Sequence, residues 1–97
     1  MTTPEGKVKA KVKQVLKHYG AYQHWPVLNG MGAPTLDCVG CHRGRFFAIE
    51  TKAEGKKPTP RQLLTMAEMR TAGAVVFIVS CDAELQTLET FLKSFGD

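Results

Sequence analysis

Three polar residues near the middle of the chain, Asp37, Glu50 and Lys52, are of the types that perform metal-assisted hydrolysis of phosphodiester bonds. That reaction needs a hard cation to neutralise the phosphate and activate water, and carboxylate oxygens are the ligands that such a cation prefers. The backbone carbonyl of Thr51 could complete the protein ligands, and a nearby ammonium could hold the water and stabilise the developing charge. These residues therefore predict a metal-dependent nuclease site.

Residues 46–52, which carry two of these side chains, form a run of apolar residues that ends in Glu-Thr-Lys. Such a run predicts a buried strand. Side chains alternate between the faces of a strand, so Glu50 and Lys52 share one face, about 6 to 7 Å apart, while Thr51 belongs to the other. Burying an acid and an amine is costly unless they are paired or hold a metal, which favours a chemical role for both.

Two predicted helix starts add candidate supporting residues, Glu5 and Gln62. Each follows a threonine, Thr2 or Thr59, at the spacing of a capping box, in which the two residues satisfy each other's backbone N–H groups. Capping by itself accounts for both residues. The inward stripe of the first helix also reaches Glu5, and helix N-termini attract anions, so a role for both in the site stays open.

The predicted elements follow the order helix, three strands, helix, strand, helix. The helices begin at Thr2, Thr59 and Asp82, and the strands cover residues 21–28, 35–41, 46–52 and 75–79. Short connections between the first three strands predict an antiparallel meander, and the strand-helix-strand unit that follows predicts a right-handed parallel crossover. The sequence therefore predicts one α/β domain, residues 1–97, with a mixed central sheet flanked by helices.

Apolar periodicity predicts the face that each element buries. The first helix has its stripe at Val8, Val12, Val15, Leu16 and Tyr19; the second at Leu63, Met66 and Ala67; the last at Leu85, Leu88, Phe91, Leu92 and Phe95. Residues 75–79 are wholly apolar, which predicts a strand buried on both faces.

The charge of the chain favours an anionic partner. Its 97 residues carry a formal net charge of +4, with a pI of about 9.1. The lysines of the first helix, with Lys56, Lys57 and Arg61, could contact phosphates, although such a face is most often only solvated. No apolar run approaches the roughly 18 residues of a membrane span, and the N-terminus lacks a secretory pattern. We therefore expect an intracellular protein whose three cysteines are reduced.

The motifs in this order resemble the PD-(D/E)XK nuclease superfamily and, within it, the small stand-alone phage form of the virus-type replication-repair nuclease domain, VRR-NUC. The matching residues are Glu5, Pro34-Thr35-Leu36-Asp37, Ile49-Glu50-Thr51-Lys52 and Thr59-Pro60-Arg61-Gln62. The resemblance covers nearly the whole chain and implies a restriction-endonuclease-like αβββαβ(α) core. It also implies Mg²⁺ or Mn²⁺ held by Asp37, Glu50 and the Thr51 carbonyl, a catalytic Lys52, and supporting roles for Glu5 and Gln62.

The same resemblance implies a substrate and an assembly. Stand-alone viral members resemble Holliday-junction resolvases, which implies branched or four-way DNA as substrate and a homodimer, for which Trp25, Met31 and Phe95 are candidate interface residues. One local feature departs from the superfamily pattern. The name-giving proline directly precedes the aspartate there, whereas Thr35 and Leu36 separate Pro34 from Asp37 here.

Two alternatives from other functional classes stay open. A noncatalytic DNA-binding module would use the basic surface without turnover. Cys38-Val39-Gly40-Cys41-His42 matches a c-type haem attachment pattern, which the absence of an export signal disfavours, and it could hold zinc with His18, His24 or Cys81. Strand alternation separates Cys38 from Cys41, which favours both as small core residues.

Overall fold

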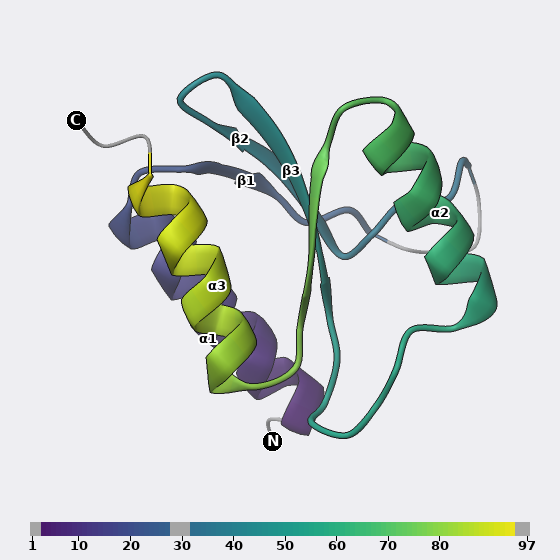
Figure 1. Ribbon diagram of the computed structural model, residues 1–97. Coiled ribbons are helices and arrows are strands. Elements are labelled where there is room, and N and C mark those ends of the chain that lie inside the picture. Colours follow the sequence, from purple (N-terminus) through teal and green to yellow (C-terminus); the bar gives the residue numbers. More distant parts are fainter. Residues whose placement is uncertain (1–2, 28–31, 95–97) are drawn as a thin grey trace.

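The computed structural model describes residues 3–27 and 32–94 and has a central sheet with helices on both faces (Figure 1). The elements are α1 (Pro4–His18), β1 (Tyr22–His24), β2 (Cys38–His42), β3 (Arg45–Thr51), α2 (Pro60–Thr71), β4 (Val75–Val79) and α3 (Asp82–Lys93). This is the order that the sequence predicts, and the α/β class with a mixed sheet is confirmed.

The four strands lie in the order β1-β2-β3-β4. β1 and β2 pair antiparallel, as do β2 and β3, whereas β4 lies parallel to β3 after the α2 crossover. The β2–β3 turn has two residues, Arg43 and Gly44, with φ angles of 50° and 87°. Positive φ at both positions is the geometry that matches the twist of a tight hairpin. The predicted meander and parallel crossover are both confirmed.

Alternation along β3 divides the core into two clusters. Phe47 and Ile49 are fully buried in the larger cluster, together with residues of α1 and α3. Ala48 points to the other face and packs against Leu36 and against Met66 of α2. By the same alternation Glu50 belongs to the α2 side of the sheet, where it contacts Gln62, and apolar packing on both faces holds β3 in place.

The strand boundaries differ from the predicted ones. β1 covers only Tyr22–His24 of the predicted residues 21–28, because Pro26 has no N–H to donate to a ladder. β2 begins at Cys38 instead of residue 35, and β3 ends at Thr51. Lys52 lies just beyond β3, although its backbone N–H still donates to the Val79 carbonyl at 3.0 Å.

Several packing predictions are wrong in detail. In α2, Met66 is buried as predicted, whereas Leu63 is 50% exposed and Ala67 is exposed, because the helix turns Thr65 inward beside Met66. β4 is half-buried over four of its five residues, since it is the edge strand of the sheet. The stripes of α1 and α3 are confirmed within the described residues; Phe95 lies outside them.

The helix caps also differ at two of the three starts. Thr3 caps α1, accepting a bond from the Gly6 N–H at 2.9 Å, so the capping box predicted for Glu5 is wrong. Thr2 lies outside the described residues. At α3 the N-cap position is Cys81, and Asp82 is the first helical residue. The box of Thr59 and Gln62 is confirmed.

No helix in the described part of the chain is both long enough and apolar enough to cross a membrane.

Candidate nuclease site

Four of the predicted site residues, Asp37, Glu50, Lys52 and Gln62, come together at the carboxyl end of β3. Glu50 lies on that strand, Lys52 just beyond it, Asp37 just before β2, and Gln62 in the first turn of α2. The antiparallel register pairs Cys38 with Ile49, which places Asp37 beside the end of β3. Strand pairing and the crossover helix thus bring together residues that are 25 positions apart at most.

Thr51 holds Asp37 by two hydrogen bonds. Its backbone N–H donates to Asp37 Oδ2 at 3.0 Å, and its hydroxyl donates to the same oxygen at 2.7 Å. Thr51 is fully buried and Asp37 is 8% exposed. The residues that separate Pro34 from Asp37 therefore do not remove the aspartate from the site, since Leu36 is buried in the core under α2 and Asp37 is tied to β3.

Glu50 receives two nitrogen groups on one oxygen. Gln62 Nε2 donates to Glu50 Oε2 at 2.9 Å, and Lys52 Nζ lies 3.6 Å from the same atom. Glu50 is 3% exposed. Its burial, and then the charge of Asp37, raise the pKa of Glu50 from 4.5 to about 7, while Lys52 opposes the rise. The single ammonium does not balance two close carboxylates.

Gln62 caps the start of α2 and also contacts Glu50 of the candidate site. Its Oε1 accepts the Thr59 N–H at 2.9 Å, and its backbone N–H donates to the Thr59 hydroxyl at 3.2 Å. Because the cap fixes the amide oxygen, the amide nitrogen is directed to Glu50. The capping role and the site role that the sequence leaves open for Gln62 are therefore compatible. The Gln62–Glu50 hydrogen bond joins the first turn of α2 to the site.

Glu5 is not brought into this cluster by any contact among the described residues. It lies in the first turn of α1 and pairs with Lys9 at 3.6 Å. α1 packs on the face of the sheet opposite α2, although it begins near the carboxyl ends of β3 and β4 (Figure 1). The structure therefore gives Glu5 a helix-surface ion pair in place of a carboxylate contact.

The donor set fits a hard divalent cation. Mg²⁺ is usually held by one or two carboxylates, with water and substrate phosphate in the other positions, and Asp37 and Glu50 supply that number. Burial, and then the charge of Asp37, raise the pKa of Glu50, and a bound cation would favour the ionised carboxylate against both effects. Among the described residues, no group of three histidine, cysteine, aspartate or glutamate side chains is arranged to hold a metal.

Comparison with known proteins finds similarity at the level of structure. No protein-family model matches the sequence, and no curated protein does. A solved structure described as a VRR_NUC domain aligns with a TM-score of 0.76 and 28% identity, covering 90% of this chain and 95% of that one. The chain is a VRR-NUC-like domain. The family resemblance seen in the motifs is thereby confirmed, and the relative indicates a nuclease domain.

The cysteine motif of the VRR-NUC-like domain does not form a cluster. Cys38 and His42 are buried on the α1 and α3 side of β2, with His42 Nε2 3.2 Å from the Leu92 carbonyl oxygen, whereas Cys41 is exposed on the other face. Burial raises the pKa of the Cys38 thiol to about 11, which disfavours the thiolate that binds zinc. The core interpretation is right for Cys38 and wrong for Cys41.

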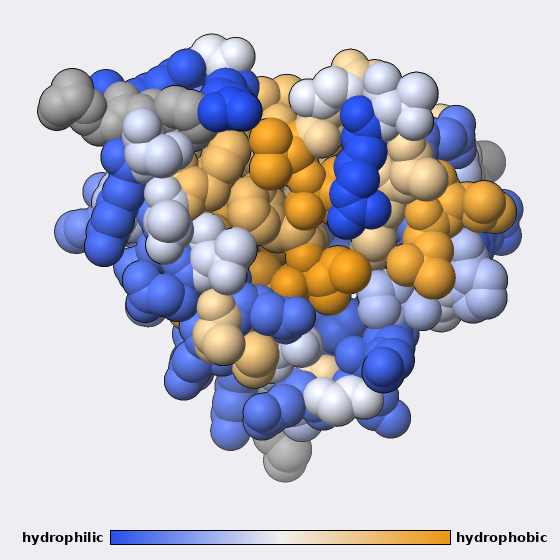
Figure 2. All heavy atoms as spheres, in the orientation of Figure 1, coloured by the Kyte–Doolittle hydropathy of each residue, from blue (hydrophilic) through white to orange (hydrophobic). Residues whose placement is uncertain are grey.

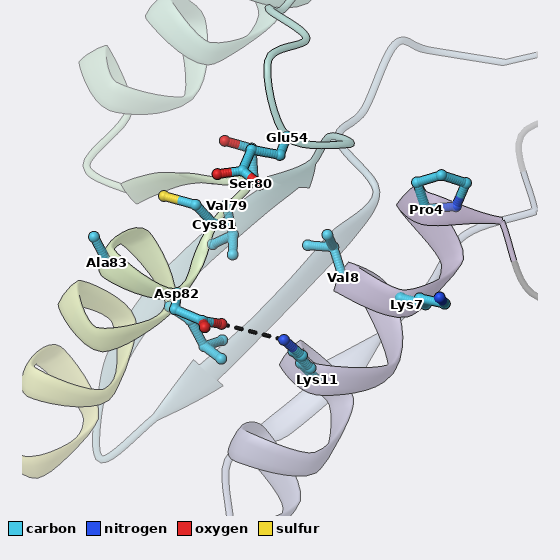
Figure 3. Close-up of a pocket in the computed structure, with 11 residues that line it drawn as sticks. Pro4, Lys7, Val8, Lys11, Glu54, Val79, Ser80, Cys81, Asp82 and Ala83 are labelled. Atoms are coloured by element: carbon cyan, nitrogen blue, oxygen red, sulfur yellow. Dashed lines mark hydrogen bonds and ion pairs between the residues drawn. The ribbon is translucent and has the colours of Figure 1, made fainter.

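A cleft of about 570 Å³ lies beside the site, between the first turns of α1 and α3 (Figure 3). Val8 and Val79 form apolar walls, and Lys11 pairs with Asp82 at 3.2 Å across it. Asp37, Glu50 and Lys52 do not line this cleft, but the Val79 carbonyl that accepts the Lys52 N–H connects the two places. The candidate site therefore lies outside this cleft, at the sheet end where Glu50 contacts Gln62 of α2.

The sequence predicts a site role for the Thr51 carbonyl but not the hydrogen bond that the Thr51 hydroxyl donates to Asp37. Strand alternation alone turns the Thr51 side chain away from Glu50, so the sequence predicts no contact between that side chain and the site. The antiparallel neighbour that brings Asp37 within reach of its hydroxyl is a tertiary contact over 14 positions. The signal in the sequence is only that a hydroxyl residue stands between the acid and the lysine.

Proposed function

We propose that the VRR-NUC-like domain is a Mg²⁺-dependent, structure-selective DNA endonuclease of the Holliday-junction resolvase type, with Mn²⁺ able to substitute. The observation that carries this proposal is the convergence of Asp37, Glu50 and Lys52 at one strand end, two buried carboxylates beside one ammonium. The solved VRR_NUC domain supports the nuclease class. The preference for branched DNA rests on the family resemblance.

Each residue has a distinct task in this mechanism. Asp37 and Glu50 would hold the cation with the Thr51 carbonyl, and the cation supplies neutralisation of the phosphate and activation of water. Lys52, 14% exposed at the edge of the site, orients the attacking water and stabilises charge on the phosphate oxygens. Gln62 holds Glu50 Oε2 in place by its 2.9 Å hydrogen bond, and it limits rotation of that carboxylate.

The decisive experiment incubates pure protein with labelled four-way junctions, flaps and plain duplex, in Mg²⁺, Mn²⁺ or EDTA. We expect cleavage that needs the cation and is faster on branched DNA. Lys52→Ala should lower the rate about 100-fold or more, since a single electrostatic stabiliser commonly contributes 10² to 10³. Glu50→Ala should lower it at least as far.

The outcomes separate the competing functions. Cleavage that survives either substitution would place the active site elsewhere. Salt-sensitive DNA binding without cleavage in any metal would favour the noncatalytic module. Stoichiometric zinc in the purified protein, or a haem absorption band, would favour the cysteine motif instead.

A homodimer suits a junction substrate, because two active sites related by a two-fold axis would meet two symmetric strands. The open edge of β4 supports this assembly. All five of its residues are apolar, four of them are half-buried, and within the described strands it pairs only with β3. Figure 2 shows apolar residues gathered on the face between α3 and α2, where β4 runs. An apolar edge without charge or proline is suited to pairing with another copy.

A further inference from the structure

The connection from β3 to α2, residues 53–59, is flanked on both sides by residues that contact the same atom, Glu50 Oε2. At one end Lys52 Nζ lies 3.6 Å from Glu50 Oε2, and at the other Gln62 Nε2 lies 2.9 Å from it. The chain between them is therefore a closed loop on the catalytic carboxylate. It carries three exposed cations on itself and at the start of α2, Lys56, Lys57 and Arg61.

Closure limits how far these cations can be from the site. An extended chain spans at most about 3.6 Å per residue, so the backbone of Lys57, five residues from either end, lies within about 18 Å of the anchoring residues. Lys56 is closer, since its N–H bonds back to the Ala53 carbonyl at 3.0 Å. Arg61 is adjacent to Gln62. Phosphates in B-DNA advance about 3.4 Å per strand along the axis, so the phosphates next to the one attacked fall within this reach.

Three of the five lysines of α1 are engaged by other side chains, whereas Lys7 and Lys17 resemble the loop cations in having no ion pair among the described residues. In α1, Lys9 pairs with Glu5 at 3.6 Å and Lys11 with Asp82 at 3.2 Å, while Lys13 lies over the Trp25 ring. Among the described residues, none of the three loop cations has an ion pair or a side-chain hydrogen bond. The acidic residue of the loop, Glu54, lines the cleft between α1 and α3 (Figure 3).

We infer that Lys56, Lys57 and Arg61 bind the phosphates that flank the scissile one, so that the DNA backbone enters the site over the α2 side of the sheet end. This inference rests on the proposed nuclease function and identifies the surface that the DNA contacts. Such contacts fix register without reading sequence.

The test compares two double variants that lose the same charge. Lys56→Ala with Lys57→Ala removes the loop cations, and Lys17→Ala with Lys93→Ala removes two exposed lysines from the last turns of α1 and α3. Binding of labelled DNA is measured in EDTA by fluorescence anisotropy over a series of KCl concentrations. We expect the loop variant to lower the slope of log K against log salt by about 1 per lysine and the control to leave it unchanged.

Equal loss of slope in both variants would show only a general charge effect and would overturn the inference, as would no loss in the loop variant. Both pairs lie on the surface, so melting temperatures should match the wild type. If the loop variant does not fold, Arg61→Gln is compared with Lys17→Ala, since each of these variants loses one positive charge. Cleavage assays separate the two proposals. A selective slope loss in a protein that cuts no DNA would refute the nuclease alone, and unchanged binding in an active nuclease would refute the loop contact alone.

Discussion

At the scale of single residues, the site depends on how Thr51 and Gln62 hold two carboxylates that would otherwise repel each other. Asp37 Oδ2 is taken by both donors of Thr51, and Glu50 Oε2 by Gln62 and Lys52. Each acid is thus restrained through one oxygen. Side chains that orient metal ligands in this way commonly alter metal affinity when they are removed.

Thr51→Val tests this positioning, because valine keeps the shape and removes only the hydroxyl that donates to Asp37 at 2.7 Å. We expect the affinity for Mn²⁺, measured by calorimetry, to fall about 10-fold, with a similar loss of cleavage rate. Thr51→Ser keeps a hydroxyl and should recover most of the affinity. Wild-type Mn²⁺ affinity in the valine variant would contradict a positioning role.

The raised pKa of Glu50 predicts how stability of the metal-free protein depends on pH. The folded pKa is about 7 and the ordinary value 4.5, so between these values the folded state keeps a proton that the unfolded state releases. The contribution of this group to the free energy of unfolding is therefore full below pH about 4.5 and is lost as pH rises through 7.

Glu50→Gln cannot ionise, so its free energy of unfolding should rise relative to that of the wild type as pH rises from 5 to 8 in EDTA. The difference should reach roughly 1 to 3 kcal/mol. Urea denaturation at several pH values measures this difference. Glu54→Gln removes an exposed acid as a control and should stay within about 0.5 kcal/mol of the wild type. A gap between Glu50→Gln and wild type that does not grow with pH would contradict the prediction.

At the scale of elements, the site depends on the pairing of β1, β2 and β3 around Gly40. A Cβ at this position would overlap the Tyr22 carbonyl oxygen and would lie 2.7 Å from Cζ of Phe47. Phe47 is fully buried, so its ring has little room to move. The glycine therefore allows β1 and the core to approach the hairpin that carries Asp37 and Glu50.

Gly40→Ala should lower the free energy of unfolding by about 2 to 3 kcal/mol, the usual cost of inserting a methyl into a packed core. Urea denaturation followed by circular dichroism would measure the change. The neighbouring Cys41→Ala, on the exposed face of the same strand, serves as the matched control and should change stability by less than about 0.5 kcal/mol. A Gly40→Ala protein as stable as that control would show that β1 can move aside.

At the scale of the whole molecule, the proposed dimer would give this small chain a second active site and cover the β4 edge. Light scattering should return twice the 10.7 kDa chain mass at working concentration. Amide exchange at Val75–Val79 should also slow as concentration rises, because outward N–H groups would gain partners. A monomer mass across all concentrations would refute the dimer. Of the interface candidates, Trp25 packs against the main core, and Met31 and Phe95 lie outside the described residues.

The sequence by itself determined the order of the elements and the position of β3. It also identified Glu50, Lys52 and Gln62, which lie together at the end of that strand. Hydrophobic alternation and capping spacing are local, so they can be found without knowledge of tertiary contacts. The shared side of Glu50 and Lys52 and the capping box of Thr59 and Gln62 are both confirmed. Glu5 shows the limit of this reasoning, since an inward position on a helix does not tell which face of the sheet that helix covers.

The tertiary structure alone decided which groups touch. Asp37 meets the Thr51 hydroxyl across a strand pair, and Gln62 reaches Glu50 across a crossover of 12 positions. Edge position leaves β4 half-buried although its residues are all apolar. These facts depend on strand order and register, which arise from the packing of distant segments, and residue spacing along the chain does not carry that information.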